Sequence, residues 1–318
     1  MKQTRREFVR TLFVATQGAV VGSLISPGLF AADMPPSFAA GNLRFLVFGD
    51  WGRNGEKDQV EVAIQMARAS KNISAQFIIS VGDNFYEEGV KSVADPQWQT
   101  SFENVYRDSA LQIPWQVILG NHDYCGDCDA QIEYSKSHPR WNMPARYFVQ
   151  TYRIDESNTA DFFYLDTTPM IKSYRNQNKI GPNIAAQDVA KQLAWFKNAL
   201  GASKARWKIA FGHHPIYSGG KHSDTADLVE QVLPLLHEYK VQAWFNGHDH
   251  DLQHLADDKM NFFCSGAGSQ VSITQRIQQS KFLESTPGFI TVALSQSEMN
   301  VQMIDHLGTL LYRATIPS

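Results

Sequence analysis

Five short motifs of this sequence combine a glycine with side chains that bind metal ions. The motifs are Gly49-Asp50-Trp51-Gly52, Gly82-Asp83-Asn84-Phe85-Tyr86, Gly120-Asn121-His122-Asp123, Gly212-His213-His214-Pro215 and Gly247-His248-Asp249-His250. Carboxylates, an amide oxygen, imidazoles and a phenol are ligands for hard and borderline metal ions. They are numerous enough for two ions, and two ions about 3.5–4 Å apart hold a phosphate between them during a displacement. The motifs therefore predict a dinuclear metal site for chemistry on phosphate esters.

Each motif directly follows a short apolar run that predicts a buried strand. These runs span residues 43–48, 77–81, 115–119, 208–211 and 242–245. Short apolar runs that end in turn residues are typical of strands inside a sheet. Open α/β sheets bind ligands beyond the carboxyl ends of their strands, and a glycine there lets the backbone turn sharply. One such motif alone is equally consistent with an ordinary turn, but all of them in succession indicate a site.

Helices are predicted between these strands, and a strand-rich region follows them. Apolar residues recur with helical spacing in 58–69, 97–106, 187–200 and 227–239. Further strands are expected at 147–154, 161–165, 261–264, 289–294, 300–304 and 310–315. This order predicts an α/β fold, a four-layer αββα sandwich of two mixed β-sheets flanked by helices. One domain over residues 43–318 is expected to contain all of it.

Residues 1–32 are expected to be an export signal rather than part of the fold. A twin arginine, Arg5-Arg6, precedes an apolar run over 12–25 and the small pair Ala31-Ala32. The run is too short and too interrupted to span a bilayer of ~30 Å, so a cleaved twin-arginine signal is favoured over a membrane anchor. Residues 33–42, rich in Pro, Ala and Gly, are a predicted linker. We therefore expect a periplasmic or secreted protein that uses the twin-arginine export machinery and has no stable membrane anchor.

The composition excludes some classes of partner. The chain of 318 residues is 43% hydrophobic and 19% charged, which is ordinary for a globular protein. Its net charge is −3 with both signs interspersed, so no nucleic-acid or membrane-surface binding is expected. Affinity for an anionic substrate must then come from a local site that contains added cations.

The cysteines leave one thiol over if a disulfide forms. Cys125 and Cys128 make a C-x-x-C sequence, and Cys264 lies far from both. A zinc ribbon would need a second pair. A local disulfide between Cys125 and Cys128 is expected in an exported protein, and a regulatory role for this pair remains open. Cys264 is expected to be a small buried hydrophobe.

The motifs resemble those of the calcineurin-like metallophosphoesterase superfamily, and more narrowly those of the small purple acid phosphatases, which include the animal tartrate-resistant acid phosphatases. The resemblance runs from Arg44 to about Gly268. In the wider superfamily the first motif is Asp-x-His, whereas Gly52 stands at the histidine position here. The missing ligand is replaced by Tyr86, three residues after Asp83. This substitution points to the purple acid phosphatases, which implies the metallophosphoesterase fold.

The resemblance implies two metal sites that share one carboxylate. The ligands that it implies for a ferric ion are Asp50, Asp83, Tyr86 and His250. The ligands that it implies for a second, divalent ion (Fe²⁺, Zn²⁺ or Mn²⁺) are Asp83, Asn121, His213 and His248. Free tyrosine has a pKa of about 10, so a phenolate ligand needs a strong Lewis acid such as Fe³⁺.

The resemblance also implies catalytic residues and a reaction. His122 matches the residue that holds the phosphate and gives a proton to the leaving group, and Asp123 is expected to orient it. His222 matches a second active-site histidine of the animal enzymes, with a solvated loop histidine as the alternative. His214 stands where the animal enzymes often have tyrosine. The implied activity is an acid phosphatase that hydrolyses small phosphate monoesters by direct attack of a metal-bound hydroxide.

Two other main functions remain open at this point, and redox chemistry at the iron centre remains open as a side activity. A phosphodiesterase or nucleotidase would share the metal site and differ in the loops at 87–96, 125–144 and 219–225. A non-catalytic envelope protein that binds iron or phosphate belongs to another class. His122 argues against that second alternative, because binding alone does not require a proton donor. The sequence indicates no oligomeric state.

Overall fold

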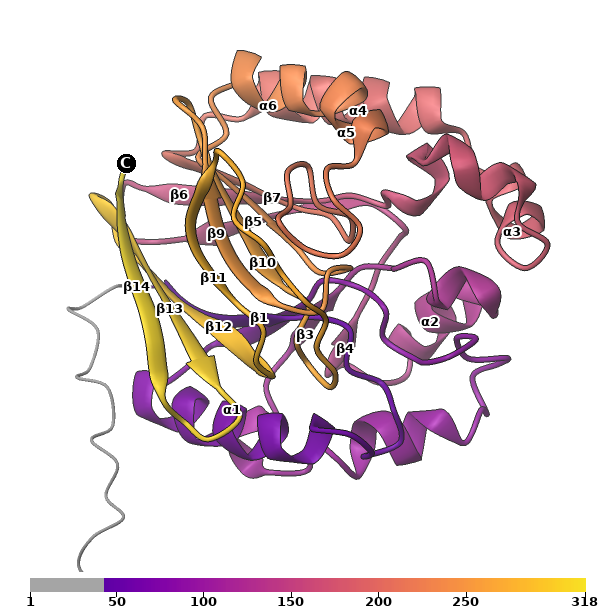
Figure 1. The fold of residues 1–318 in the computed structure, drawn as a ribbon. Helices are drawn as coiled ribbons and strands as arrows, with labels where there is room; N and C mark the ends of the chain where they lie inside the picture. Colours follow the sequence, from indigo (N-terminus) through magenta and orange to yellow (C-terminus); the bar gives the residue numbers. More distant parts are fainter. Residues whose placement is uncertain (1–42) are drawn as a thin grey trace, which may run out of the picture. The chain divides into compact units, whose positions relative to one another are not determined.

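The computed structural model describes residues 43–318. The predicted export signal (1–32) and linker (33–42) lie outside this part of the chain. The described residues form two seven-stranded sheets, with helices on their outer faces (Figure 1). This arrangement confirms the predicted four-layer sandwich of two mixed sheets.

The first sheet combines the start of the described chain with its end. Its strand order is β14-β13-β12-β1-β2-β3-β4. The strands are β1 (Leu43–Phe48), β2 (Phe77–Ser80), β3 (Trp115–Val117), β4 (Trp141–Asn142), β12 (Gly288–Leu294), β13 (Glu298–Asp305) and β14 (Leu310–Pro317). β1 pairs with β2 in parallel and with β12 in antiparallel orientation, so the sheet is mixed.

The second sheet is built from the middle of the chain. Its strand order is β11-β9-β10-β8-β7-β6-β5. The strands are β5 (Phe148–Arg153), β6 (Thr159–Tyr164), β7 (Trp207–Phe211), β8 (Ala243–Asn246), β9 (Leu252–Ala256), β10 (Asn261–Ser265) and β11 (Ser280–Glu284). β7 and β8 are parallel neighbours, as are β1 and β2 in the other sheet. The motifs thus leave each sheet at the carboxyl ends of adjacent parallel strands.

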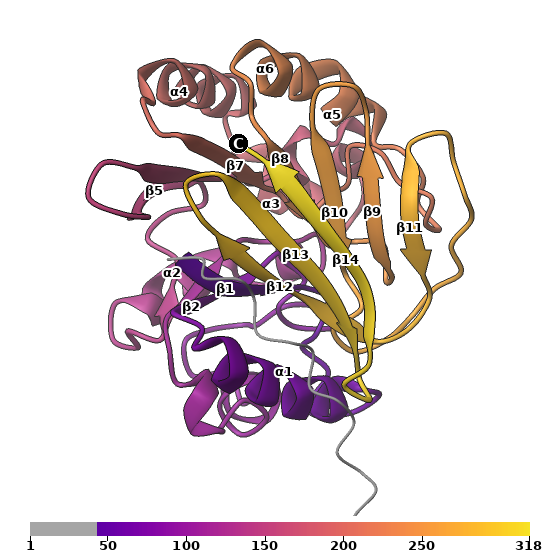
Figure 2. The same ribbon diagram turned by 90° about the vertical axis from the view of Figure 1, so that its left-hand side faces the viewer.

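Helices cover the outer faces of the sheets (Figure 2). The α-helices are α1 (Gln59–Ile73), α2 (Cys128–Ser135), α3 (Gly181–Ala185), α4 (Val189–Ala202), α5 (Ala226–Gln231) and α6 (Leu233–Glu238). Buried residues of α1, α2 and α3 belong to the apolar cluster on the outer face of the first sheet. Those of α4, α5 and α6 pack on the second sheet. No helix in the described range 43–318 is long and apolar enough to cross a membrane.

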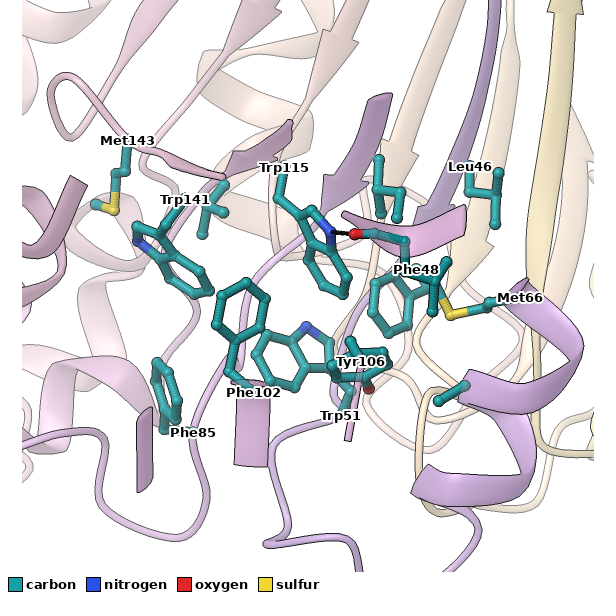
Figure 3. Close-up of a cluster of buried hydrophobic side chains, with 14 of the residues drawn as sticks. Leu46, Phe48, Trp51, Met66, Phe85, Phe102, Tyr106, Trp115, Trp141 and Met143 are labelled. Atoms are coloured by element: carbon teal, nitrogen blue, oxygen red, sulfur yellow. Dashed lines mark hydrogen bonds between the residues drawn. The ribbon is translucent and has the colours of Figure 1, made fainter. Parts of the chain in front are cut away.

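Alternation along the strands divides the core into layers. In β1, Phe45 and Val47 lie in the cluster between the sheets, whereas Leu46 and Phe48 lie in the cluster beneath α1. Side chains of a strand point to opposite faces in turn, so one apolar strand supplies two cores. Trp51 is fully buried among aromatic rings in the outer cluster (Figure 3). The first metal-binding motif is therefore attached to a rigid support.

The prediction of one continuous helix at 227–239 is wrong. The structure has two short helices, α5 and α6, with Pro234 in the first turn of α6. Proline has no N–H to continue the hydrogen-bonding pattern of a preceding helix. The helix expected at 97–106 is a single wide turn of π-helix at Trp98–Glu103. The elements α2, α3, β4, β9 and β11 were not predicted.

Candidate metal centre

The predicted ligands come from loops of both sheets. Asp50 follows β1, Asp83 and Tyr86 follow β2, and Asn121 follows β3. From the second sheet, His213 follows β7, while His248 and His250 follow β8. Contacts within 3.4 Å join all of these side chains into one group, in which the residues other than Asn121, His248 and His250 are buried and those three are half-buried. The structure therefore brings together every residue that the sequence predicts as a metal ligand.

One set of atoms that can bind a metal ion, here called donor atoms, surrounds the hydroxyl of Tyr86. This oxygen lies 3.0 Å from Oδ1 of Asp50, 2.9 Å from Oδ2 of Asp83 and 3.0 Å from Nε2 of His250. The two carboxylate oxygens are acceptors, and one phenolic hydrogen can satisfy only one of them. A cation shared by these oxygens would satisfy all of them at once.

A second set surrounds Nε2 of His213. This nitrogen lies 3.1 Å from Oδ1 of Asn121, 3.3 Å from Nδ1 of His248 and 3.4 Å from Oδ2 of Asp83. Nδ1 of His213 donates to the carbonyl oxygen of Val81 at 2.9 Å. In its neutral form the ring would therefore turn the lone pair of Nε2 toward the other metal-binding atoms, which is how ligating histidines are oriented.

The spacing of these atoms fits metal coordination. Ligands at about 2.0–2.2 Å from an ion are about 3 Å apart when they occupy neighbouring corners of an octahedron. The observed separations of 2.9–3.4 Å between the donor atoms match that value. Oδ2 of Asp83 belongs to both sets, which makes this carboxylate the natural bridge between two ions.

The electrostatics favour a cation at the same place. Burial opposes ionisation of Asp83, but His213 and His122 hold its pKa well below the usual value. Burial also opposes protonation of His213, yet the Asp83 carboxylate raises the pKa of that ring to about 9. Burial and then the carboxylates of Asp50 and Asp83 raise the pKa of Tyr86 well above its usual value. A phenolate at Tyr86 therefore requires a strong Lewis acid.

The backbone under these side chains is in an uncommon conformation. Asp50, Asp83 and His248 have φ values of 61°, 50° and 69°, in the left-handed region that most residues avoid. Residues held in such regions cluster at functional sites, where the surrounding structure enforces them. A Cβ at Gly120 would lie 2.2 Å from Oδ1 of Asp83, so only glycine leaves room for that carboxylate.

His122 lies beside the first set of donors. Its ring is 4.4 Å from that of Tyr86 between centroids, and its backbone N–H donates to Oδ1 of Asp83 at 2.8 Å. Nδ1 of His122 lies 2.6 Å from the carbonyl oxygen of Glu87 and donates to it. Because Nδ1 is engaged in this way, a second proton on the ring would lie on Nε2. There it could be donated to a bound substrate.

Asp123 has partners other than the His122 ring. Its buried carboxylate accepts hydrogen bonds from the backbone N–H groups of Gly120 and Asn84 at 2.8 and 3.1 Å and from Nε2 of Gln131 at 2.8 Å. Burial, together with the nearby Asp83, raises the pKa of Asp123 to about 7. These contacts correct the expected role: Asp123 holds the loops that carry Asp83 and Asn121, and Glu87 is the residue that orients His122.

His222 reaches the second set of donors. Its ring lies 4.2 Å from that of His248 between centroids, with the two planes tilted by 32°. Nδ1 and the backbone N–H of His222 lie 2.9 and 2.8 Å from Oδ1 of Asp249, which is fully buried. The other oxygen of Asp249 accepts from the Ser218 hydroxyl at 2.5 Å. Sequence reasoning missed Asp249, although its place between two predicted ligands was a signal.

His214 lies next to the predicted metal ligands but is not one of them. Nδ1 of its ring lies 2.8 Å from the hydroxyl oxygen of Thr167, and Nε2 lies 3.1 Å from that of Tyr174. Burial and the neighbouring His213 hold its pKa well below the usual value. His214 also lies near enough to His213 and His248 to complete a three-histidine cluster, but both of its nitrogens already have partners.

The expected disulfide between Cys125 and Cys128 is absent from this structure, where all the cysteines are free. The two intervening residues, Gly126 and Asp127, have extended backbone conformations. The Cys128 thiol donates to the carbonyl oxygen of Asp123 at 3.5 Å. Cys264 is buried, as predicted.

Comparison with known proteins agrees with this geometry. The family model described as calcineurin-like phosphoesterase matches residues 43–252. Purple acid phosphatase 17 of Arabidopsis thaliana is 34% identical over 305 residues, which cover 91% of this chain and 89% of that protein. Tartrate-resistant acid phosphatase type 5 of Sus scrofa is 37% identical over 302 residues, which cover 86% and 87%.

A solved structure also resembles this one closely. It is titled GAP50, the anchor in the inner membrane complex of Plasmodium. It superposes with a TM-score of 0.76 at 26% identity over 87% of this chain and 89% of that chain. The fold therefore also occurs in a protein that is described as an anchor.

Proposed function

The chain belongs to the calcineurin-like phosphoesterases and, among them, to the purple acid phosphatases, and we propose that it hydrolyses small phosphate monoesters at a dinuclear metal centre. The observation that carries this proposal is the position of Asp83. One oxygen of its carboxylate lies 2.9 Å from the Tyr86 hydroxyl and 3.4 Å from Nε2 of His213. A single carboxylate thereby joins two donor sets.

We assign a different ion to each set. The set with the phenol, which suits Fe³⁺, consists of Asp50, Asp83, Tyr86 and His250. The set that is rich in imidazole, which suits Fe²⁺, Zn²⁺ or Mn²⁺, consists of Asp83, Asn121, His213 and His248. Bound there, two cations would supply the positive charge that attracts a phosphate and the Lewis acidity that activates water. That charge would supply an affinity for anions, which the net charge of −3 does not provide.

The chain's own residues then bind, orient and protonate. His122, fixed by the Glu87 carbonyl, holds a proton on Nε2 for the oxygen of the leaving group, the role of a general acid. His222, fixed by the buried carboxylate of Asp249, presents its ring beside His248, where it would contact a bound phosphate. The two histidines thus have separate supports, Glu87 in the loop after β2 and Asp249 in the loop after β8.

Metal content tests the assignment directly. Asp83→Ala removes the shared ligand, so the purified variant should lose both ions and all phosphatase activity. Asn121→Ala removes a ligand of one set only, so it should retain the ion bound by the set that contains Tyr86. The metal content of both variants after dialysis shows whether the two ligand sets share Asp83. Equal loss of both ions in the two variants, or loss of neither, would contradict two sets that share Asp83.

A second candidate function is the non-catalytic binding protein that the sequence left open, and a protein described as an anchor shares the fold. A non-catalytic iron-binding or phosphate-binding envelope protein would keep the metal ligands and need no proton donor. His122 is present and held in place by a 2.6 Å hydrogen bond, which favours the enzyme. Turnover of a phosphate monoester by the metal-replete protein separates the two functions.

Export by the twin-arginine machinery to the periplasm, or beyond the cell, completes the proposal. It is supported by Arg5-Arg6 and the apolar run over 12–25. This machinery moves folded proteins, so metal ions can enter the site before export. Replacing Arg5 and Arg6 by lysine should leave the protein and its phosphatase activity in the cytoplasmic fraction. Unchanged export would contradict this route and leave the proposed activity untouched.

A further inference from the structure

Arg53 follows the first metal-binding motif and covers one face of Tyr86. Its side chain is 10% exposed. The central carbon of its guanidinium group lies 3.7 Å from the centre of the Tyr86 ring. The ring of His122 lies near the same phenol, 4.4 Å away between centroids. Two cationic or ionisable groups thus contact the one phenol among the predicted ligands.

The guanidinium group is fixed by bonds to two other segments. Its Nη1 donates to Oε1 of Glu87 at 2.6 Å, and its Nε donates to the hydroxyl oxygen of Ser269 at 3.2 Å. The Ser269 hydroxyl donates in turn to the carbonyl oxygen of Asp50 at 2.5 Å. Arginine is suited to this place, because its planar group stacks on a ring while its edge donates hydrogen bonds.

Glu87 connects Arg53 to the predicted general acid. The side chain of Glu87 accepts from Arg53, and its carbonyl oxygen accepts from Nδ1 of His122 at 2.6 Å. Tyr86 directly precedes Glu87 in the chain. The contacts therefore form a closed group in which the same residue anchors both neighbours of the Tyr86 ring.

We propose that Arg53 is a positioning residue that holds the Tyr86 ring in the metal centre and places a fixed positive charge over it. This proposal rests on the proposed function, because it concerns Tyr86 as a ligand of Fe³⁺. A cation over an aromatic face is attracted to its electrons. It therefore lowers the energy of the electrons that a phenolate donates to the ion, which shifts the visible charge-transfer band to shorter wavelength.

The position of that band is the first readout. In the iron-loaded full chain, Arg53→Met should move the band to longer wavelength, because it removes the charge and keeps an apolar contact. Arg53→Lys keeps a charge without the planar stack and should give an intermediate shift. Arg68→Met is the matched control, since Arg68 donates to Gln65 on an exposed face of α1, and its band should match the wild type. A band that stays in place in Arg53→Met would overturn the proposal.

A second readout requires no iron. In the metal-free protein, Arg53→Met, Tyr86→Leu and the double variant form a mutant cycle, which isolates the contact between the two side chains. We expect the losses of Tm in the single variants to exceed, when added, the loss in the double variant. Additive losses would show that the two groups do not interact and would overturn the proposal. A colourless but iron-containing wild type would instead refute the proposed ligand set, and the cycle would still decide the contact.

Discussion

The hydroxyl oxygen of Tyr86 lies 3.0 Å from Nε2 of His250, although 164 residues separate the two in the chain. Tyr86 belongs to the loop after β2 of the first sheet, and His250 to the loop after β8 of the second. Each loop leaves its sheet at the carboxyl end of a parallel strand, where ligand sites of such sheets form. The metal centre is therefore a product of packing two sheets together, and neither sheet contains it alone.

This relationship predicts the colour of the protein. Tyr86→Phe removes the phenol and keeps the ring, so the iron-loaded variant should lose its visible absorbance while its circular dichroism and fold remain. Tyr134→Phe is the control, because the Tyr134 hydroxyl contacts Glu103 in the outer apolar cluster, and its colour should not change. Unchanged colour in Tyr86→Phe would show that Tyr86 is not a ligand of the iron.

Gly120 predicts a second, steric effect. A Cβ at Gly120 would lie 2.2 Å from Oδ1 of Asp83, so Gly120→Ala should displace that carboxylate and lower the metal content after dialysis. Gly201→Ala is the matched control, because a Cβ there meets only the Tyr239 ring at 3.4 Å. Gly201 lies in α4, where alanine is favoured over glycine by about 1 kcal/mol, so the control should retain its metal and its stability. Full metal retention by Gly120→Ala would contradict the account.

The residues of the site could be predicted from the sequence because each of them belongs to a short motif of consecutive residues. A glycine and a ligand after each apolar run are visible without any tertiary information, and all the ligands predicted from these motifs meet in the structure. The strands that carry them, such as β1 at Leu43–Phe48, also agree with the predicted ranges. Alternation and length define such strands locally.

The supporting contacts could not be predicted because they depend on packing between distant segments. Asp123 was expected beside the ring of His122 but lies among backbone N–H groups and Gln131. The ring of His122 instead donates a hydrogen bond to the carbonyl oxygen of Glu87. The break at Pro234 was within reach of sequence reasoning, whereas β11 was not, since its pairing with β9 is formed only in the tertiary fold.

His254 predicts a pH dependence of stability away from the metal centre. Its ring is 4% exposed, stacks on Phe263 and contacts the Tyr312 hydroxyl and Asn261. Burial lowers the pKa of His254 to about 4 from its usual 6.5. Between these values the unfolded chain binds a proton that the folded chain does not, so stability is lost as pH falls from 6.5 to 4. The full loss is about 3 kcal/mol.

Denaturant unfolding measures this effect. The free energy of unfolding of the wild type should fall between pH 7 and pH 4, and His254→Gln should fall by less over the same range because glutamine does not titrate. Other groups contribute to the slope in both proteins, so the difference between the two slopes is the relevant quantity. Identical slopes would show that His254 is not held neutral by the fold.

The central claim, a dinuclear-metal phosphatase for monoesters, is tested most directly by one comparison of rates. The metal-replete protein is assayed from pH 4 to 8 on an aryl phosphate monoester and on the matching diester, with His122→Ala alongside. The account predicts a clear preference for the monoester, an optimum in the acidic range and a loss of about 10²–10⁴-fold in the variant, as for removal of a general acid. A preference for the diester would make the protein a phosphodiesterase with the same metal site. Turnover of neither ester would contradict the account and support a binding protein.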